Sequence, residues 1–245
     1  MDRRMAVVII KGLSKGYNKG SVKAVDNLDL HVRPGEIFGF LGPNGAGKTT
    51  TIKMMVGLIN PDSGSITING YDMARQPLEV KKCIGYVPDN PDIYEKLTGM
   101  EYLKFMADVY RVPSNVRKER IEYYLEMFGL TNAASDLIKS YSHGMKQKIA
   151  LIGAIIHDPA LWILDEPMVG LDPKSAHQLK ELMRQHCDKG NTVFFSTHVL
   201  EVAEKLCDRL AIINKGKLVA IGTMDELRKG DQADSLENIF LELTE

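Results

Sequence analysis

Residues 42–49 carry the clearest chemical pattern in the chain. They read Gly-Pro-Asn-Gly-Ala-Gly-Lys-Thr, which matches G-x-x-x-x-G-K-[ST] at every fixed position. Glycines let backbone N–H groups converge on phosphate oxygens, because no Cβ blocks the approach. Lys48 would add a mobile positive charge for the β- and γ-phosphates, where it would act in catalysis, and Thr49 would offer a hydroxyl to Mg²⁺. The residues expected to contact nucleotide phosphates are Gly42, Pro43, Asn44, Gly45, Ala46, Gly47, Lys48, Thr49 and Thr50.

Asp165 and Glu166 supply the carboxylates that such a site needs for hydrolysis. They follow the apolar run Leu161–Leu164, and α/β sheets bind ligands at the carboxyl ends of their strands. We expect Asp165 to hold Mg²⁺, directly or through water. Glu166 would turn toward the attacking water as a general base or as the residue that positions this water, a role worth roughly 10²- to 10⁴-fold in rate. Taken alone the pair also fits a solvated turn at a strand end, but the phosphate loop favours the catalytic interpretation.

The segments around the loop predict the elements that would position it. Short β-branched or alternating segments bounded by Gly, Asn and Pro turns predict strands. They are Val7–Lys11, Leu28–Val32 and Ser65–Asn69. Glu36–Leu41 is almost continuously apolar, which indicates a strand buried on both faces of a parallel sheet. The helix after the loop is expected over Lys48–Leu58, with its positive N-terminal end toward the phosphates. This strand and helix argue against the alternative of a chance glycine-rich turn.

The middle of the chain changes to a helical pattern. Thr98 and Glu101 fit a capping box before Tyr102–Tyr110, and Ser114 opens a second helix that Gly129 closes. Strand-like and helical segments then alternate again, which argues for a parallel-sheet core. They are Leu161–Leu164, Ser175–Cys187, Thr192–Ser196, Leu210–Ile213 and Lys217–Ala220.

Length, composition and charge narrow the function classes. The 245 residues, 44% of them hydrophobic, suit one α/β domain over 1–245, with an inserted helical subdomain over about 90–158 and a helical tail over about 223–245. A net charge of −1 does not favour a broad nucleic-acid-binding surface, so no nucleic-acid partner is expected. The three cysteines lack C-x-x-C spacing, which indicates a reducing compartment. No apolar run approaches the roughly 20 residues of a transmembrane helix, so we expect a cytoplasmic protein.

Three further segments, in order along the chain, resemble the motifs of one family. Residues 141–147 read Tyr-Ser-His-Gly-Met-Lys-Gln, which is similar to the signature motif of ABC-type ATPases. Gly170–Asp172 resembles their D-loop, and Ser196–His198 resembles their H-loop. The resemblance covers Val7–Ile221. It implies an α/β fold of the P-loop NTPase (RecA-like) type: a mixed, largely parallel sheet core, an N-terminal antiparallel β-subdomain and an inserted α-helical subdomain. It also implies hydrolysis of ATP with Mg²⁺.

The same resemblance assigns roles outside the loop. Tyr17 would stack on adenine, although a core tyrosine on an N-terminal strand is the alternative. His198 would contact the γ-phosphate and help orient the attack as a catalytic residue. The signature would face nucleotide held by a second cassette, and Ser142 is a natural N-cap for a helix whose dipole points at that phosphate. The residues implied for this shared nucleotide are Ser142, His143, Gly144, Met145 and Asp172.

Two features depart from the family's pattern. The signature usually reads Ser-Gly-Gly-Gln, and here His143 and Met145 stand at its second and fourth positions. Where the family usually has a glutamine near Mg²⁺ and the attacking water, this chain has Asp89. Asp89 is either a metal or water contact or part of a purely structural turn over residues 89–91. Both departures resemble cassettes of exporters with separately encoded membrane subunits.

The resemblance favours the ATPase subunit of a membrane transporter, and an exporter in particular. Its expected partners are transmembrane permease subunits and a second cassette, most simply a second copy, on the cytoplasmic face of the membrane. Residues 92–99 are the candidate docking surface, with Ile93, Tyr94 and Leu97 as apolar anchors, while ordinary packing under a loop is the alternative. A soluble ABC-type ATPase of DNA repair, chromosome organisation or translation, and a small-molecule kinase or GTPase, are the other classes considered. The cargo stays open.

Overall fold

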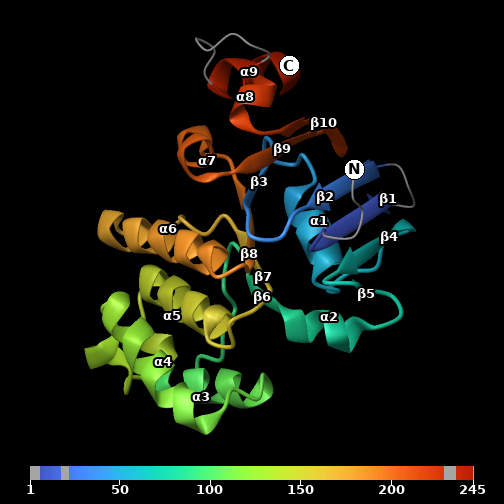
Figure 1. Cartoon of the computed structure of the whole chain (residues 1–245). Helices are drawn as coiled ribbons and strands as arrows, with labels where there is room; N and C mark the ends of the chain where they lie inside the picture. Colours follow the sequence, from blue (N-terminus) through green and yellow to red (C-terminus); the bar gives the residue numbers. More distant parts are fainter. Residues whose placement is uncertain (1–5, 18–21, 229–235, 245) are drawn as a thin grey trace.

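Residues 6–17, 22–228 and 236–244 are described by the computed structural model (Figure 1). These residues form a six-stranded sheet and a four-stranded sheet. In hydrogen-bonding order, the strands of the larger sheet are β10 (Lys217–Gly222), β9 (Arg209–Asn214), β3 (Ile37–Leu41), β8 (Thr192–Thr197), β7 (Leu161–Asp165) and β6 (Ile84–Val87). All neighbours are parallel except β9 and β10. Every residue of β3, β7 and β8 is buried, as expected for strands covered on both faces.

The carboxyl ends of three central strands lie at one edge of this sheet. Leu41 at the end of β3 is paired with Thr197 at the end of β8, and Asp165 at the end of β7 is paired with Ser196. The residues that follow these strands are therefore brought together. This register delivers the phosphate loop, Glu166 and His198 to the same place.

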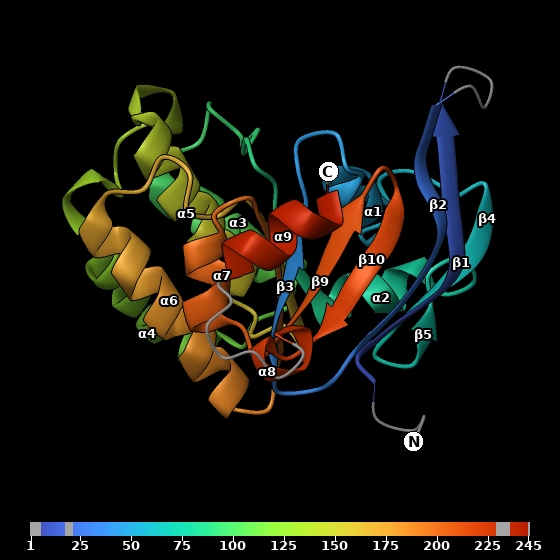
Figure 2. The ribbon, with the colours of Figure 1, turned by 90° about the horizontal axis from the view of Figure 1, so that it is seen from above.

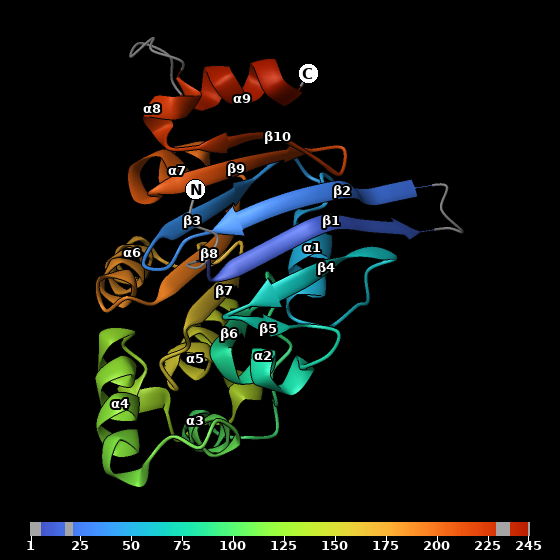
Figure 3. The same cartoon turned by 45° about the vertical axis from the view of Figure 1, so that its right-hand side comes forward.

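The smaller sheet is antiparallel and lies beside the larger one (Figure 3). Its strands, in hydrogen-bonding order, are β2 (Val22–Val32), β1 (Val8–Tyr17), β4 (Ser63–Ile68) and β5 (Tyr71–Asp72). Together the two sheets confirm the predicted class, an α/β fold with a mixed sheet core and an antiparallel sheet near the N-terminus.

Helix α1 (Lys48–Met55) packs between the two sheets (Figure 2). Ile52 and Met55 are fully buried in a cluster that also contains Ile10 of the smaller sheet and Phe40 of the larger one. Burial on both sides fixes the helix axis, and hence the direction in which its N-terminus points.

The opposite face of the larger sheet is covered by helices. Helices α5 (His143–Ile155) and α6 (Pro173–Asp188) share a core with Leu164, Phe195 and other strand residues. The elements between β6 and β7 are α3 (Gly99–Val109), α4 (Ser114–Met127), two 3₁₀ turns (Thr131–Ala133 and Ile138–Ser140) and α5 itself. In Figure 1, α3 and α4 lie on the side of α5 that faces away from the larger sheet. The capping box of Thr98 and Glu101 is confirmed at the start of α3.

The remaining helices are α2 (Pro77–Cys83), α7 (Leu200–Leu206), α8 (Met224–Leu227) and α9 (Leu236–Thr244). The last two lie within the predicted tail over about 223–245, and α9 packs on α7 and β9 around the buried Leu236. The outermost ends of the predicted domain, residues 1–5 and 245, lie outside the described residues. Among the described helices, none combines the length and apolar character that crossing a membrane requires.

Several element boundaries differ from those predicted. Helix α1 ends at Met55 instead of Leu58, because Gly57 adopts a φ of +70° and the Leu58 N–H turns back to the Lys53 carbonyl at 2.9 Å. Strands β1 and β2 run longer than expected, since they pair with each other from Val8 to Tyr17. The sequence analysis did not place the short elements β5, α2 and α7.

Candidate functional site

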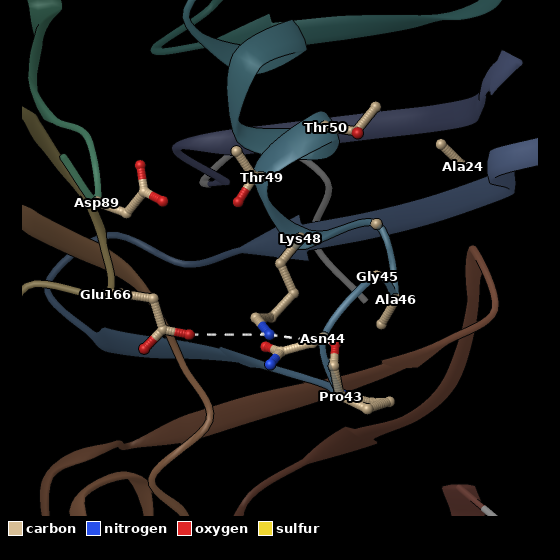
Figure 4. Close-up of a pocket in the computed structure, with 11 residues that line it drawn as sticks. Ala24, Pro43, Asn44, Gly45, Ala46, Lys48, Thr49, Thr50, Asp89 and Glu166 are labelled. Carbon is tan, nitrogen blue, oxygen red and sulfur yellow. Dashed lines mark hydrogen bonds and ion pairs between the residues drawn. The ribbon is translucent and has the colours of Figure 1, made fainter. Parts of the chain in front are cut away.

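A cavity of about 220 Å³ lies at the edge where β3, β7 and β8 end (Figure 4). Its lining residues are Ala24, Pro43, Asn44, Gly45, Ala46, Gly47, Lys48, Thr49, Thr50, Asp89 and Glu166. The predicted phosphate loop from Pro43 to Thr50 therefore surrounds one cavity, and two acidic residues from distant parts of the sequence face it.

Close backbone packing explains the glycines at two loop positions. A Cβ on Gly47 would stand 2.2 Å from the Ala24 carbonyl oxygen, and φ there is +110°. A Cβ on Gly42 would stand 2.4 Å from the Ile213 carbonyl oxygen. Gly47 is also the residue before α1, so the free N–H groups of the first helical turn point at the cavity. The loop packs against Ala24 of β2 and Ile213 of β9, and these contacts hold it in a conformation that can bind an anion.

Lys48 is the positively charged side chain in the cavity lining, and it is only 7% exposed. Its Nζ donates to the Gly42 carbonyl at 2.6 Å and lies 3.8 Å from Glu166 Oε1. Burial lowers the pKa of Lys48, and the carboxylates of Glu166 and Asp165 act in the opposite direction. The side chain is thus held beside the two residues that the sequence predicts for hydrolysis.

Asp165 is fully buried at the end of β7. Its Oδ1 accepts a 2.5 Å hydrogen bond from Ser196 Oγ, while its Oδ2 has no partner among the described residues. Burial raises the pKa of Asp165, and the charges of Asp89 and Glu166 raise it further, whereas the hydrogen bond from Ser196 and the nearby hydroxyl of Thr49 lower it. A buried carboxylate oxygen without a partner is costly unless a ligand satisfies it.

Glu166 lies between two partners. Its Oε2 is 3.0 Å from His198 Nδ1, and its Oε1 is the atom that faces Lys48. The His198 side chain is 55% exposed, so it is not an internal structural histidine. The structure therefore brings together the three residues predicted as catalytic.

Asp89 faces the cavity from the segment after β6, and Figure 4 shows its carboxylate on the side of Thr49 and Glu166. Its Oδ1 also accepts the Asn90 N–H at 2.8 Å. Both sequence readings thus describe part of its surroundings, since Asp89 takes part in a local turn and also lines the cavity.

The segment 142–145 lies outside the cavity lining. Ser142 caps α5, and its Oγ accepts the Met145 N–H at 3.3 Å, as predicted for an N-cap. A Cβ on Gly144 would stand 2.6 Å from the Gly170 carbonyl oxygen, so this position needs glycine. The side chain of His143 lies close to Gly170 as well. The segment therefore packs against the chain that follows Glu166 and leaves Ser142 exposed.

Two other predicted nucleotide contacts also lie away from the cavity. Asp172 caps α6, and its Oδ2 accepts from Lys148 Nζ at 2.8 Å. The hydrogen bond from Lys148 is the main reason that the pKa of Asp172 is well below its usual range. Tyr17 is 42% exposed at the end of β1, so the alternative of a core tyrosine is wrong.

Comparison with known proteins decides the family. Residues 25–169 match the family described as ABC transporter. The chain belongs to the ABC transporter family. The linearmycin resistance ATP-binding protein LnrL of Bacillus subtilis is 41% identical over 217 residues, which are 89% of this chain and 69% of that protein. The ABC-type transporter ATP-binding protein EcsA of the same organism is 37% identical over 242 residues, which are 98% of this chain and 97% of that protein.

A solved structure described as an ATP-binding subunit of an ABC transporter has the same fold. Its TM-score is 0.93 at 37% identity, and the match covers 98% of this chain and 100% of that chain. The present chain is accordingly an ATP-binding subunit of the ABC transporter family, and it is an ATPase. The recognition of the family from the signature, D-loop and H-loop is confirmed.

The residues of this cassette fit Mg²⁺. Asp165 offers a buried oxygen without a partner among the described residues, and Thr49, which lines the cavity, offers a hydroxyl. The described residues contain no group of three or more His, Cys, Asp or Glu side chains that could hold a metal by themselves. Mg²⁺ would therefore take its other ligands from phosphate and water, as this ion commonly does.

Sequence reasoning missed two residues of the cassette's site. Ser196, named from the sequence only as part of the H-loop segment, donates to Asp165 and accepts the Glu166 N–H at 3.1 Å, and the predicted parallel-sheet core was a signal for this contact. Gln147, fully buried in α5, places its Nε2 3.4 Å from the Pro167 carbonyl oxygen. This contact joins residues 20 positions apart in the sequence, so it has no local sequence signal.

Proposed function

We propose that this cassette powers a membrane exporter by binding ATP between two cassettes and hydrolysing it. The observation that carries the proposal is the Glu166 carboxylate, which lies 3.0 Å from His198 and 3.8 Å from Lys48 at the mouth of the phosphate loop. A carboxylate in this place can accept a proton from a water that attacks the γ-phosphate.

Each residue around the cavity then has a role. Lys48 and the loop N–H groups neutralise phosphate charge, which is the main contribution of such sites to phosphoryl transfer. Glu166 acts as the general base and His198 orients the attack. Thr49 and Asp165 hold Mg²⁺, which supplies charge neutralisation at the phosphates when bound. Tyr17 stacks on adenine, since its exposed ring is available to a ligand.

A second cassette completes the site in this proposal. The capped N-terminus of α5 is exposed at Ser142 and does not line its own chain's cavity. A helix N-terminus attracts anions, so it suits the γ-phosphate held by another cassette. Residues 142–145 and Asp172 would belong to that shared contact. ATP would hold the two cassettes together, and hydrolysis would release them.

The membrane partner docks, we propose, in a groove of about 650 Å³. Its lining residues are Asp92, Ile93, Tyr94, Glu95, Lys96, Leu97 and Phe105. Tyr94 is 60% exposed and Phe105 is 42% exposed, and their rings meet edge to face at 5.5 Å. Ile93 and Leu97 are partly buried against the core, so the alternative of ordinary packing under a loop fits them better than it fits Tyr94. Exposed aromatic rings commonly anchor protein interfaces.

Export as the direction of transport rests on two observations. The relative LnrL is named for resistance to linearmycin, and the departures at His143, Met145 and Asp89 resemble exporter cassettes. The chain would work at the cytoplasmic face of the membrane, bound to permease subunits. The division into a core, a helical subdomain over about 90–158 and a tail over 223–245 stays a prediction within this proposal.

The roles of Glu166 and Lys48 can be tested in the isolated cassette. Glu166→Gln keeps the size of the side chain but removes the base, so ATP turnover should fall at least about 10²-fold with ATP binding retained. Lys48→Ala should weaken ATP binding itself. Glu201→Gln, at an exposed position on α7, is the matched control and should keep normal turnover. A Glu166→Gln variant that turns over at the wild-type rate would exclude Glu166 as the base.

A further inference from the structure

The cavity holds an unusual balance of charge for a site that takes a polyanion. Its charged lining side chains are one ammonium, Lys48, and two carboxylates, Asp89 and Glu166. The carboxylate of Asp165 lies buried behind them, where its charge also acts on Lys48. The family resemblance places a neutral glutamine at position 89, so this chain carries an additional negative charge where phosphate would approach.

Asp89 is oriented so that this charge reaches the cavity. One of its oxygens, Oδ1, accepts the Asn90 N–H, and the other accepts no hydrogen bond from the described part of the chain. Figure 4 shows the carboxylate on the same side of the cavity as the Thr49 hydroxyl. The local turn therefore fixes the side chain without using all of its hydrogen-bonding capacity.

A second, independent feature indicates that a cation belongs here. Asp165 is fully buried, and its Oδ2 is without a partner among the described residues. A buried carboxylate oxygen in this condition is stabilised by a positive ligand. The cavity thus has the anion-binding loop on one side and the carboxylates of Asp89 and Glu166, with the buried Asp165, on the other.

We propose that Asp89 makes nucleotide binding by this cassette depend on the metal, so that ATP is accepted as its Mg²⁺ complex and metal-free ATP is rejected. Metal-free ATP would bring its phosphate charges against Asp89, Asp165 and Glu166 with only Lys48 and the loop N–H groups to offset them. Thr49 and Asp165 would hold Mg²⁺, whose two positive charges would offset two of these three negative charges and leave Lys48 and the loop N–H groups to bind the phosphates. The inference rests on the proposed nucleotide site and assigns its selectivity to Asp89.

The test is the affinity for ATP measured by isothermal titration calorimetry, once with excess Mg²⁺ and once with EDTA. For the wild-type chain we expect metal-free ATP to bind at least about tenfold more weakly than the Mg²⁺ complex. Repulsion between one carboxylate and a phosphate that are several ångströms apart weakens binding by roughly that factor. Asp89→Gln should tighten binding of metal-free ATP by about tenfold and change binding of the Mg²⁺ complex much less. Asp89→Asn keeps an acceptor for the Asn90 N–H and should behave in the same way.

Asp188→Asn, at the exposed end of α6, removes the same charge from a residue that does not line the cavity. It should leave both affinities unchanged. Thermal unfolding of each variant shows that the chain is folded. If Asp89→Gln and the wild type have the same ratio of the two affinities, the role of Asp89 is wrong and the nucleotide site stands. If the wild-type chain binds ATP under neither condition, the proposed function fails and this inference fails with it.

Discussion

Glu166 has a backbone φ of +49°, in the left-handed region that non-glycine residues seldom adopt. Its N–H is held by the backbone oxygen of Ser196 at 3.2 Å and by the Ser196 Oγ at 3.1 Å. The unusual conformation turns the chain away from the β7 direction immediately after Asp165. Two adjacent carboxylates can therefore serve different purposes, one buried under the loop and the other facing Lys48 and His198. Strained residues of this kind cluster at active sites.

The burial of Asp165 gives a prediction for stability against pH. Its pKa is raised above the unfolded value, so the folded chain binds the proton more tightly than the unfolded chain does. Stability without nucleotide should consequently fall as pH rises from the unfolded pKa of Asp, about 3.9, through the raised folded pKa. Asp165→Asn does not titrate, so it should be more stable than the wild type above this window, and the difference should shrink as pH falls through it.

Urea unfolding with EDTA and without nucleotide measures this difference, and Asp188→Asn is the control. If Asp165→Asn is no more stable than the wild type at neutral pH, the buried carboxylate does not lower the free energy of unfolding.

At the scale of elements, α5 links the proposed docking groove to the proposed second-cassette contact. Lys146, in the first turn of α5, pairs with Glu95 of the groove at 2.5 Å. Gln147, the next residue of α5, contacts the Pro167 carbonyl directly after Glu166. One helix end therefore touches the groove, the signature segment and the catalytic turn. Movement of the groove by a partner would be transmitted to the site through these contacts.

Breaking the Lys146–Glu95 pair tests this connection. An exposed pair contributes little to stability, on the order of 0–1 kcal/mol, so Lys146→Ala should fold and keep the basal ATP turnover of the isolated cassette. It should reduce, by several-fold or more, the change in turnover that the membrane partner causes. Tyr94→Ala, in the groove itself, should have a similar effect.

The matched control is Lys118→Ala, which removes another exposed lysine pair, with Glu122 on α4. Equal coupling in Lys146→Ala and Lys118→Ala would show that the pair does not carry the signal from the groove.

For the whole molecule, the sequence predicted the elements that have local signals. The phosphate loop, the capping box of Thr98 and Glu101, and the strands β3, β7 and β8 each follow from residue types within a few positions. Features that depend on distant segments were out of reach. The length of β1 arises from its pairing with β2, and the exposure of Tyr17 follows from its place at the end of that pairing.

The candidate site shows the same division. Lys48, Thr49, Asp165 and Glu166 were predicted from local patterns. Lys48, Thr49 and Glu166 line one cavity, and Asp165 is buried at the adjoining end of β7. Contacts between residues distant in the sequence, such as that of Gln147 with Pro167, had no local sequence signal. Asp89 stood between two readings because only the three-dimensional structure shows that its turn and its place in the cavity coexist.

We propose that ATP bound at this cavity joins two cassettes and that hydrolysis with Glu166 as the base separates them. The most direct test is the molar mass of Glu166→Gln in solution, measured by light scattering during gel filtration with and without ATP and Mg²⁺. We predict a monomer without nucleotide and a stable dimer with ATP, with ADP failing to form it, and Glu201→Gln remaining monomeric under turnover. A Glu166→Gln variant that binds ATP and stays monomeric would contradict the account.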